Sequence, residues 1–443
     1  MKSIGVVICN YNKKGYVLKC IQAVRESNIT DYDIYVVDNA STDGSAQAIR
    51  ERYGSAVSVI CNEENLGGSG GFNTGIRRVT EMGYSYICCL DNDALLDENA
   101  LAAMRSFLQE HRDVGMVGAK IFHMHDTARI QQYGLNIDFE CCQARTLFAD
   151  VVDDEKVPEV VYCDTVAACA LMIPLEVAKK IGPMPEDNFI YWDDMEWGYQ
   201  VKQAGYQVAA IAAAKALHEM GSNQKRTNTF IQYYMWRNRI HFFMKYTPVA
   251  NREKMSVRLL SAVFGDIFEA MYNREYNISQ TIVMAYKDAL DGVRGKAQEG
   301  RILQNDGNHT DFLEFFGKVR SIEVTGDSDW AREILEAFSI PVSVNDASAL
   351  PDAKVQTCGS ILSLTEIVPD MVYLDQNLSI VAGEADAQLL SHYAFGRGMF
   401  LYMNQRLFLE SVERVGRQGT HTKAGTGRIW NAKRRLPSKY EKR

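Results

Sequence analysis

The stretch Y-I-C-C-L-D-N-D (Tyr86–Asp93) places three polar residues directly after five apolar or aromatic ones. A short, continuous apolar run of this kind is typical of a strand that is buried on both faces of a sheet. Asp91, Asn92 and Asp93 then fall at the carboxyl end of the strand, which is where open α/β sheets bind their ligands. The stretch therefore predicts a buried parallel strand that ends in a binding site.

Three earlier apolar runs show the same arrangement. The runs and the polar segments that follow them are Ile4–Cys9 with Asn10, Ile34–Val37 with Asp38 and Asn39, and Val57–Cys61 with the glycine-rich stretch Asn65–Gly75. Helical stretches separate the runs, at Gly15–Ser27, Gly44–Tyr53 and Phe72–Met82. This alternation predicts an α/β fold with a doubly wound, mostly parallel sheet, and a binding site formed by all four carboxyl ends.

The bulk composition is that of a soluble globular protein. The chain has 443 residues, enough for two or three domains, with 47% apolar and 23% charged residues. A net charge of −8 argues against nucleic acid as the main partner. The first strand follows Met1 closely and no run reaches the roughly 18 apolar residues of a membrane span, so we expect a cytoplasmic protein. Its ten cysteines are then expected to be reduced.

The pattern along the chain predicts four parts. Residues 1–225 hold the strand–helix alternation, 226–300 read as a helical segment, 318–410 as a small α/β domain of unknown role, and 414–443 as a basic tail. The tail contains ten Lys or Arg residues and one acid, Glu441, so we expect it to be disordered or to bind a surface.

The glycine-rich stretch is expected to be a ligand-binding loop. Its five glycines between Gly67 and Gly75 would let the backbone approach a ligand, and the following helix would offer free N–H groups. No Gly-Lys-Ser/Thr follows, so it is not a P-loop, and the acid Asp38 precedes the glycines, unlike the dinucleotide fingerprint. A merely flexible loop is the alternative. The candidate binding residues here are Asn65, Gly67, Gly71 and Asn73.

Two carboxylates at Asp91 and Asp93 could hold a divalent cation and the ribose of a nucleotide, although Asp and Asn are also common turn formers. His218 follows the small-residue strand V-A-A-I-A-A-A. A lone histidine is most often a packed or surface residue, and its place at another strand end strengthens the case for a metal ligand.

A third group of acids, Asp193, Asp194 and Glu196, crowds the start of a predicted helix. Helix capping explains one of these carboxylates but not all three. Neighbouring aromatic residues, Trp192 among them, would exclude water and could stack on a sugar ring. A carboxylate in such a low-dielectric pocket has a raised pKa and is a better general base.

A series of motifs occurs in order over about 245 residues. The motifs are V-V-I-C-N-Y-N, V-V-D-N-A-S-T-D-G-S, N-L-G-G-S-G-G-F-N-T-G, L-D-N-D-A, F-I-Y-W-D-D-M-E-W-G-Y, His218 and Y-Y-M-W-R-N (Tyr233–Asn238). Together they resemble the inverting nucleotide-sugar glycosyltransferases of family 2, which have the GT-A fold, and most of all the bacterial rhamnosyltransferases and galactofuranosyltransferases. The family often has Glu-Asp in place of Asp193-Asp194 and an arginine near Gln200. The part after Gly300 matches no family pattern.

The resemblance implies a role for each site residue. Asp38 would contact the base and Asp91 the ribose side of the nucleotide, with Asn10, Asn39 and Asn92 also in the donor site. Asp93 and His218 would hold Mn²⁺ or Mg²⁺, and Asp194, beside Asp193, would deprotonate the acceptor.

The implied reaction is transfer of rhamnose or galactofuranose from a nucleotide-diphospho-sugar to a hydroxyl of a cell-envelope glycan or a lipid-linked acceptor. Such acceptors lie at the inner face of the plasma membrane, where the basic tail could meet anionic lipids. Two alternatives stay open from the residues: a phosphatase of the haloacid dehalogenase type that uses Asp91, and a sugar-nucleotide-binding protein without enzymatic activity.

Overall fold

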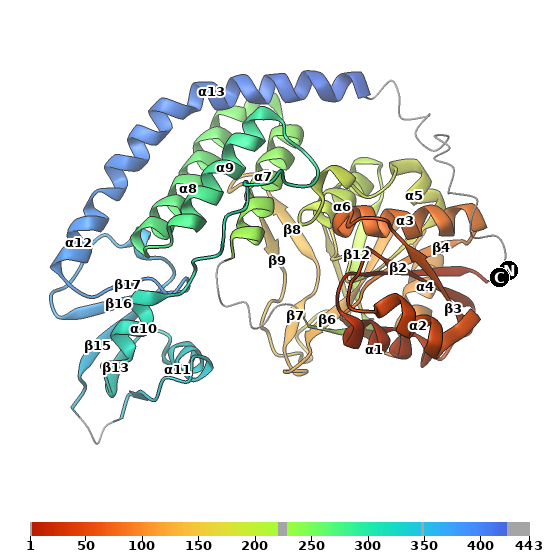
Figure 1. The fold of residues 1–443 in the computed structure, drawn as a ribbon, viewed down its shortest axis with the longest axis horizontal. Coiled ribbons are helices and arrows are strands. Elements are labelled where there is room, and N and C mark those ends of the chain that lie inside the picture. Colours follow the sequence, from red (N-terminus) through yellow and green to blue (C-terminus); the bar gives the residue numbers. More distant parts are fainter. Residues whose placement is uncertain (1, 220–227, 347–349, 423–443) are drawn as a thin grey trace.

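The computed structural model describes residues 2–219, 228–346 and 350–422 (Figure 1). A large α/β unit, the N-terminal unit, occupies one end of the molecule. Three helices, the helical unit, stand beside it, and a smaller α/β unit, the C-terminal unit, lies beyond them (Figure 1). A long last helix crosses the outer side of the helical unit.

The N-terminal unit is built around a ten-stranded sheet. Its strands are β1 (Ile4–Asn10), β2 (Tyr32–Asp38), β3 (Val57–Cys61), β4 (Tyr86–Asp91), β5 (Ala94–Leu96), β6 (Val114–His123), β7 (Ile130–Gln132), β10 (Val160–Cys163), β11 (Ala170–Pro174) and β12 (Gln207–His218). Its helices are α1 (Lys14–Arg25), α2 (Ser45–Tyr53), α3 (Gly67–Met82), α4 (Ala100–Glu110), α5 (Leu175–Ile181) and α6 (Asp193–Gln203). A separate hairpin pairs β8 (Leu135–Asp138) with β9 (Gln143–Thr146).

The strand order is β10-β12-β6-β11-β4-β1-β2-β3, and the predicted strands β3, β2, β1 and β4 run parallel. β11 is antiparallel to both of its neighbours, β4 and β6, whereas β6 and β12 pair in parallel. The sheet is mostly parallel, as the sequence predicts. The register sets Asn10 opposite Asp38 and Cys9 opposite Asp91. The polar strand ends are thereby brought to one edge of the sheet.

Two apolar cores cover the two faces of this sheet. Alternate residues of β1 point to opposite faces, with Val6 and Ile8 in one core and Val7 in the other. The first core is closed by α1, α2 and α4, and the second by α3, α5 and α6 (Figure 1). Since both faces are covered, the carboxyl edge is the part of the sheet left for a ligand.

The helical unit and the C-terminal unit follow the N-terminal unit along the chain. The helical unit comprises α7 (Thr229–Tyr246), α8 (Arg252–Tyr272) and α9 (Tyr276–Asp291). The C-terminal unit comprises α10 (Thr310–Phe316), β13 (Ser321–Thr325), α11 (Ser328–Ala337), β14 (Ser343–Val344), β15 (Ala353–Cys358), β16 (Met371–Asp375), β17 (Ile380–Val381) and α12 (Glu384–Ser391). Its strand order is β14-β13-β15-β16-β17.

The last helix, α13 (Tyr393–Thr422), runs through the predicted start of the basic tail at Arg414. Arg414 donates a hydrogen bond of 2.8 Å to the carbonyl of Leu290 in α9, so the first residue of the predicted tail contacts the helical unit. The rest of the predicted tail, 423–443, lies outside the described residues. Within the described part of the chain, no helix is long and apolar enough to cross a membrane.

The glycine-rich stretch corrects one prediction. We expected a loop with a helix from Phe72, but α3 begins at Gly67 and contains all five glycines. The reason is close packing: a Cβ on Gly71 would overlap Cys9, and one on Gly75 would overlap Val7 and lie 3.0 Å from Val37. The glycines therefore allow α3 to lie directly on β1 and β2.

We expect Gly75→Ala to lower the free energy of unfolding by about 1–3 kcal/mol, because the added methyl group overpacks the contact between α3 and β1. Urea unfolding of the purified variant measures this. Gly15→Ala is the matched control, since nothing lies within 4 Å of its added Cβ. Equal stability of Gly75→Ala and the wild type would contradict the packing role.

Candidate active site

Asp91, Asp93 and His218 form a cluster that could hold a metal ion. Asp91 ends β4, Asp93 follows it, and His218 ends β12, opposite Ala94 of β5. One ligand atom from each lies within 4.8 Å of the others, and His218 Nε2 is 3.4 Å from Asp93 Oδ1 and 3.8 Å from Asp91 Oδ2. Two carboxylates and an imidazole suit Mn²⁺ as ligands and can also bind Mg²⁺, so these residues fit the expected cation.

The ring of His218 is oriented by Gln131 of β7, which sequence reasoning missed. His218 Nδ1 lies 2.8 Å from Gln131 Oε1, and Gln131 Nε2 donates to the His218 carbonyl at 3.1 Å. Because the amide nitrogen of Gln131 already donates to the His218 carbonyl, Gln131 Oε1 is the atom that accepts a hydrogen bond from Nδ1–H of the His218 ring. The lone pair of Nε2 then faces the carboxylates, which is the arrangement of a metal-binding histidine.

Lys13 is a second residue that the sequence did not single out. It follows β1, and its ammonium group forms an ion pair with Asp93, whose side chain is buried. This pairing offsets the cost of a buried carboxylate. The edge therefore carries a positive side chain beside its acids.

Asn10, Asp38 and Asn92 form a buried hydrogen-bonded chain across three strand ends. Asn92 Nδ2 donates to Asn10 Oδ1 at 2.8 Å, and Asn10 Nδ2 donates to Asp38 Oδ2 at 3.3 Å. Asp38 also accepts from the backbone N–H of Ser41 at 2.9 Å. The structure thus brings these three predicted site residues together beside Asp91.

Asn39 and Asn65 shape the start of α3. Asn39 Nδ2 donates to Asn65 Oδ1 at 3.0 Å and to the Gly67 carbonyl at 2.9 Å, while its Oδ1 accepts from the Leu66 N–H at 3.1 Å. These bonds hold the turn that leads into the helix. Both residues lie at the predicted edge, but their amide groups are engaged within the protein.

Asn73 lies elsewhere. Its amide exchanges hydrogen bonds with both backbone groups of Met184, at 2.7 and 3.0 Å, and donates to Glu186 at 3.0 Å. It ties α3 to the segment before α6. The two glycines in the prediction, Gly67 and Gly71, lie against Phe189 and Cys9 respectively.

The acids at the start of α6 are close to the same edge. Asp194 is half-buried: its Oδ1 accepts from the Met195 N–H at 2.7 Å and its Oδ2 from the Ala168 N–H at 3.4 Å. Burial raises the pKa of both neighbouring carboxyls, and the charge of Asp194 further helps to raise the pKa of Asp193 to about 8. Repulsion from Asp91 acts in the same direction on Asp193. Since backbone donors favour the charged form, Asp194 is the better candidate for the ionised member of the pair.

The turn before α6 is strained. Phe189, Tyr191 and Trp192 have positive φ angles of 66°, 62° and 64°, which are unfavourable for large side chains. Such strain persists only where surrounding contacts enforce it, and it clusters at functional sites.

Arg237 and Asn238 of α7 enforce this turn. Asn238 Nδ2 lies within 2.9–3.0 Å of the carbonyls of Asn188, Ile190 and Tyr191, and Arg237 donates to the Asn188 carbonyl at 3.1 Å. Both side chains are buried. The segment Y-Y-M-W-R-N thus positions Asp193 and Asp194 from outside the N-terminal unit.

Two predicted site residues face away from the acids. Trp192 is 1% exposed and packs on Phe242 and Phe243, so its ring offers no free face for a sugar in this structure. Glu196 is buried and accepts from Lys245 at 2.6 Å and Tyr246 at 3.0 Å. Both residues join α6 to α7.

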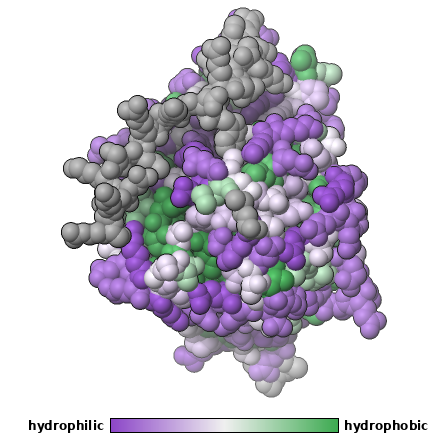
Figure 2. Space-filling model, turned by 90° about the vertical axis from the view of Figure 1, so that its right-hand side faces the viewer, coloured by the Kyte–Doolittle hydropathy of each residue, from purple (hydrophilic) through white to green (hydrophobic). Residues whose placement is uncertain are grey.

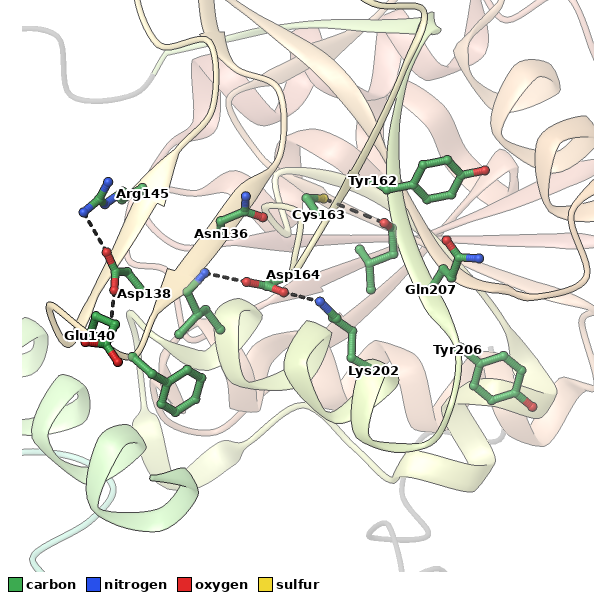
Figure 3. A pocket seen from close by; sticks show the side chains of 13 residues that line it. Asn136, Asp138, Glu140, Arg145, Tyr162, Cys163, Asp164, Lys202, Tyr206 and Gln207 are labelled. Carbon is green, nitrogen blue, oxygen red and sulfur yellow. Dashed lines mark hydrogen bonds and ion pairs between the residues drawn. The ribbon is translucent and has the colours of Figure 1, made fainter. Parts of the chain in front are cut away.

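A hollow of about 770 Å³ lies near the start of β12, whereas His218 ends that strand (Figure 3). Its lining carries two ion pairs, Asp138 with Arg145 at 2.6 Å and Asp164 with Lys202 (Figure 3). None of its lining residues is among the predicted site residues. This hollow is therefore separate from the candidate active site.

Residues 5–157, about a third of the chain, match the family model described as Glycosyl transferase family 2. The predicted resemblance is thereby confirmed. The match covers the glycine-rich helix, Asp91 and Asp93, and ends before Asp193, Asp194 and His218.

Curated relatives are distant. The chain is 22% identical over 263 residues to the galactofuranosyltransferase GlfT2 of Mycolicibacterium smegmatis, covering 54% of this chain but only 40% of that protein. It is also 22% identical over 317 residues to the dTDP-rhamnosyl transferase RfbF of Shigella flexneri, covering 68% of this chain and 98% of that protein. A solved structure described as GalNAc-T7 with UDP, GalNAc and Mn²⁺ aligns with a TM-score of 0.47 and 13% identity, over 59% of this chain and 51% of that one.

We expect Asn238→Ala to lower the free energy of unfolding by at least about 2 kcal/mol, because it removes the donor to three carbonyls of the strained turn. Urea unfolding measures the change. Asn136→Ala, at an exposed position of β8, is the control and should leave stability unchanged. If both variants are equally stable, Asn238 does not hold the turn.

Proposed function

We propose that this protein is an inverting glycosyltransferase that moves a sugar from a nucleotide-diphospho-sugar to a hydroxyl group of an acceptor. The observation that carries the proposal is the pairing of two groups at one sheet edge. One group, Asp91, Asp93 and His218, has the donors of a divalent-cation site. The other, Asp193 and Asp194, is a carboxylate pair with raised pKa values, as a general base requires.

In the proposed reaction the acceptor hydroxyl attacks the anomeric carbon from the face opposite the nucleotide. Asp194 takes the hydroxyl proton as the new glycosidic bond forms, and the bond from the anomeric carbon to the diphosphate oxygen breaks. A single base and no enzymic nucleophile give inversion at the anomeric carbon, through an oxocarbenium-like transition state.

The leaving diphosphate gains negative charge in this step. A bound Mn²⁺ or Mg²⁺, held by Asp93 and His218 with Asp91 nearby, would neutralise that charge as a Lewis acid. Lys13 contributes a further positive charge at the same edge. Asp38 and Asn10 are assigned to the nucleotide, since they lie at the ends of the neighbouring parallel strands.

The distant relatives favour rhamnose or galactofuranose as the sugar, because those are the sugars named for two curated relatives, each 22% identical to this chain. We propose a cell-envelope glycan or a lipid-linked molecule as the acceptor, at the inner face of the plasma membrane. Thermal-shift screening of nucleotide sugars with Mn²⁺ identifies the donor, since a true donor stabilises the fold by mass action.

Asp194→Asn should lower the transfer rate by about 10²–10⁴-fold and leave donor affinity nearly unchanged, because the amide cannot accept the proton. In the wild type the rate should fall as pH drops through a pKa above the usual aspartate range, since the base is then protonated. Initial rates and donor titrations over a pH series measure both effects. Near-normal turnover by Asp194→Asn would end its assignment as base.

We expect a chelator to abolish transfer and Mn²⁺ or Mg²⁺ to restore it. Binding of Mn²⁺ alone, followed by loss of its free electron paramagnetic resonance signal, should weaken strongly in Asp93→Ala and His218→Ala. Gln131→Met should weaken it by about 10–100-fold, because the histidine ring loses its orienting partner. His392→Ala, at an exposed position, is the control. Full activity in excess chelator would remove the cation from the mechanism.

A further inference from the structure

The helix α13 has an inner face that packs and an outer face that is apolar yet exposed. The inner face places Phe408 and Val412 in the core of the helical unit, and Gln405 donates to Ser256 of α8 at 3.1 Å. Figure 1 shows α13 running along the outer side of α7, α8 and α9. Its other face therefore points away from the helical unit.

Five large apolar residues form a stripe on this outer face. They recur three, four or one residue apart, as side chains on one side of a helix do. The residues of the stripe and their exposed fractions are Phe395 at 73%, Met399 at 44%, Tyr402 at 85%, Met403 at 71% and Leu407 at 51%. The face at the end of the molecule where α2, α3 and α5 lie is mainly hydrophilic and carries several apolar patches (Figure 2).

The part of α13 that carries the stripe contains few charges. Arg397 and Arg406 are exposed, and Arg406 forms an ion pair of 2.9 Å with Glu410, one turn further along the helix. The residues that follow α13, 423–443, contain eight Lys or Arg and one acid. An exposed apolar helix face that is continued by a basic segment is complementary to an anionic lipid surface.

We propose that the stripe of α13 lies in the interface of an anionic lipid membrane and docks the protein there. The apolar side chains would enter the boundary between headgroups and acyl chains, while Arg406 would stay at the phosphate level. The purpose of this contact rests on the proposed lipid-linked acceptor, but the contact itself can be measured without any transfer reaction.

The test is co-sedimentation of the full chain with vesicles of phosphatidylglycerol and phosphatidylcholine, at low and at high NaCl concentration. The wild type should bind at low salt and keep part of its binding at high salt, because burial of apolar side chains is not screened. Tyr402→Glu should weaken binding at both salt concentrations by about tenfold or more. Met403→Glu should do the same. Removal of residues 423–443 should remove only the salt-sensitive part.

Tyr276→Glu is the matched control, because Tyr276 is 55% exposed at the start of α9, away from the stripe, and binding should be unchanged. The thermal unfolding midpoint checks that each variant is folded. Equal vesicle binding by the wild type, Tyr402→Glu and Met403→Glu would overturn the proposal. So would a wild-type dimer that Tyr402→Glu converts to monomer while vesicle binding stays the same. Neither result bears on the transfer chemistry, since no donor is present.

Discussion

Four carboxylates, Asp91, Asp93, Asp193 and Asp194, converge on one edge of a sheet, and their mutual repulsion is the constraint that the surrounding structure has to offset. Burial and repulsion raise the pKa of Asp193 to about 8. Lys13 pairs with Asp93, and the N–H groups of Met195 and Ala168 hold Asp194. Such a concentration of acids is costly for a fold but suits a site that binds a cation and accepts a proton.

The helical unit has a direct part in this arrangement. Asn238 and Arg237 bind the carbonyls of the strained turn from Asn188 to Trp192, and Lys245 neutralises the buried Glu196 one turn into α6. The acids of α6 are therefore positioned by α7 as well as by the sheet. For this reason the N-terminal unit, although it contains the family match, is not the whole of the candidate site.

The sequence predicts the sheet well, because continuous apolar runs and their polar ends report burial and strand direction directly. The four parallel strands are found as expected, and Asp91, Asp93 and His218 lie together at the carboxyl edge of the sheet. The roles of Gln131 and Lys13 could not be identified from the sequence, because each depends on a contact with a residue far away along the chain. Gln131 of β7 contacts His218, and Lys13, after β1, contacts Asp93. The glycines were assigned to a loop because composition cannot separate a flexible turn from a helix packed closely on a sheet.

The most direct measurement of the central claim is an anomalous difference map from crystals grown with Mn²⁺ and UDP as the nucleotide probe. The account predicts a manganese peak enclosed by Asp91, Asp93 and His218, with the nucleotide reaching toward Asp38. A peak between Asp193 and Asp194, or a nucleotide bound away from this sheet edge, would contradict it.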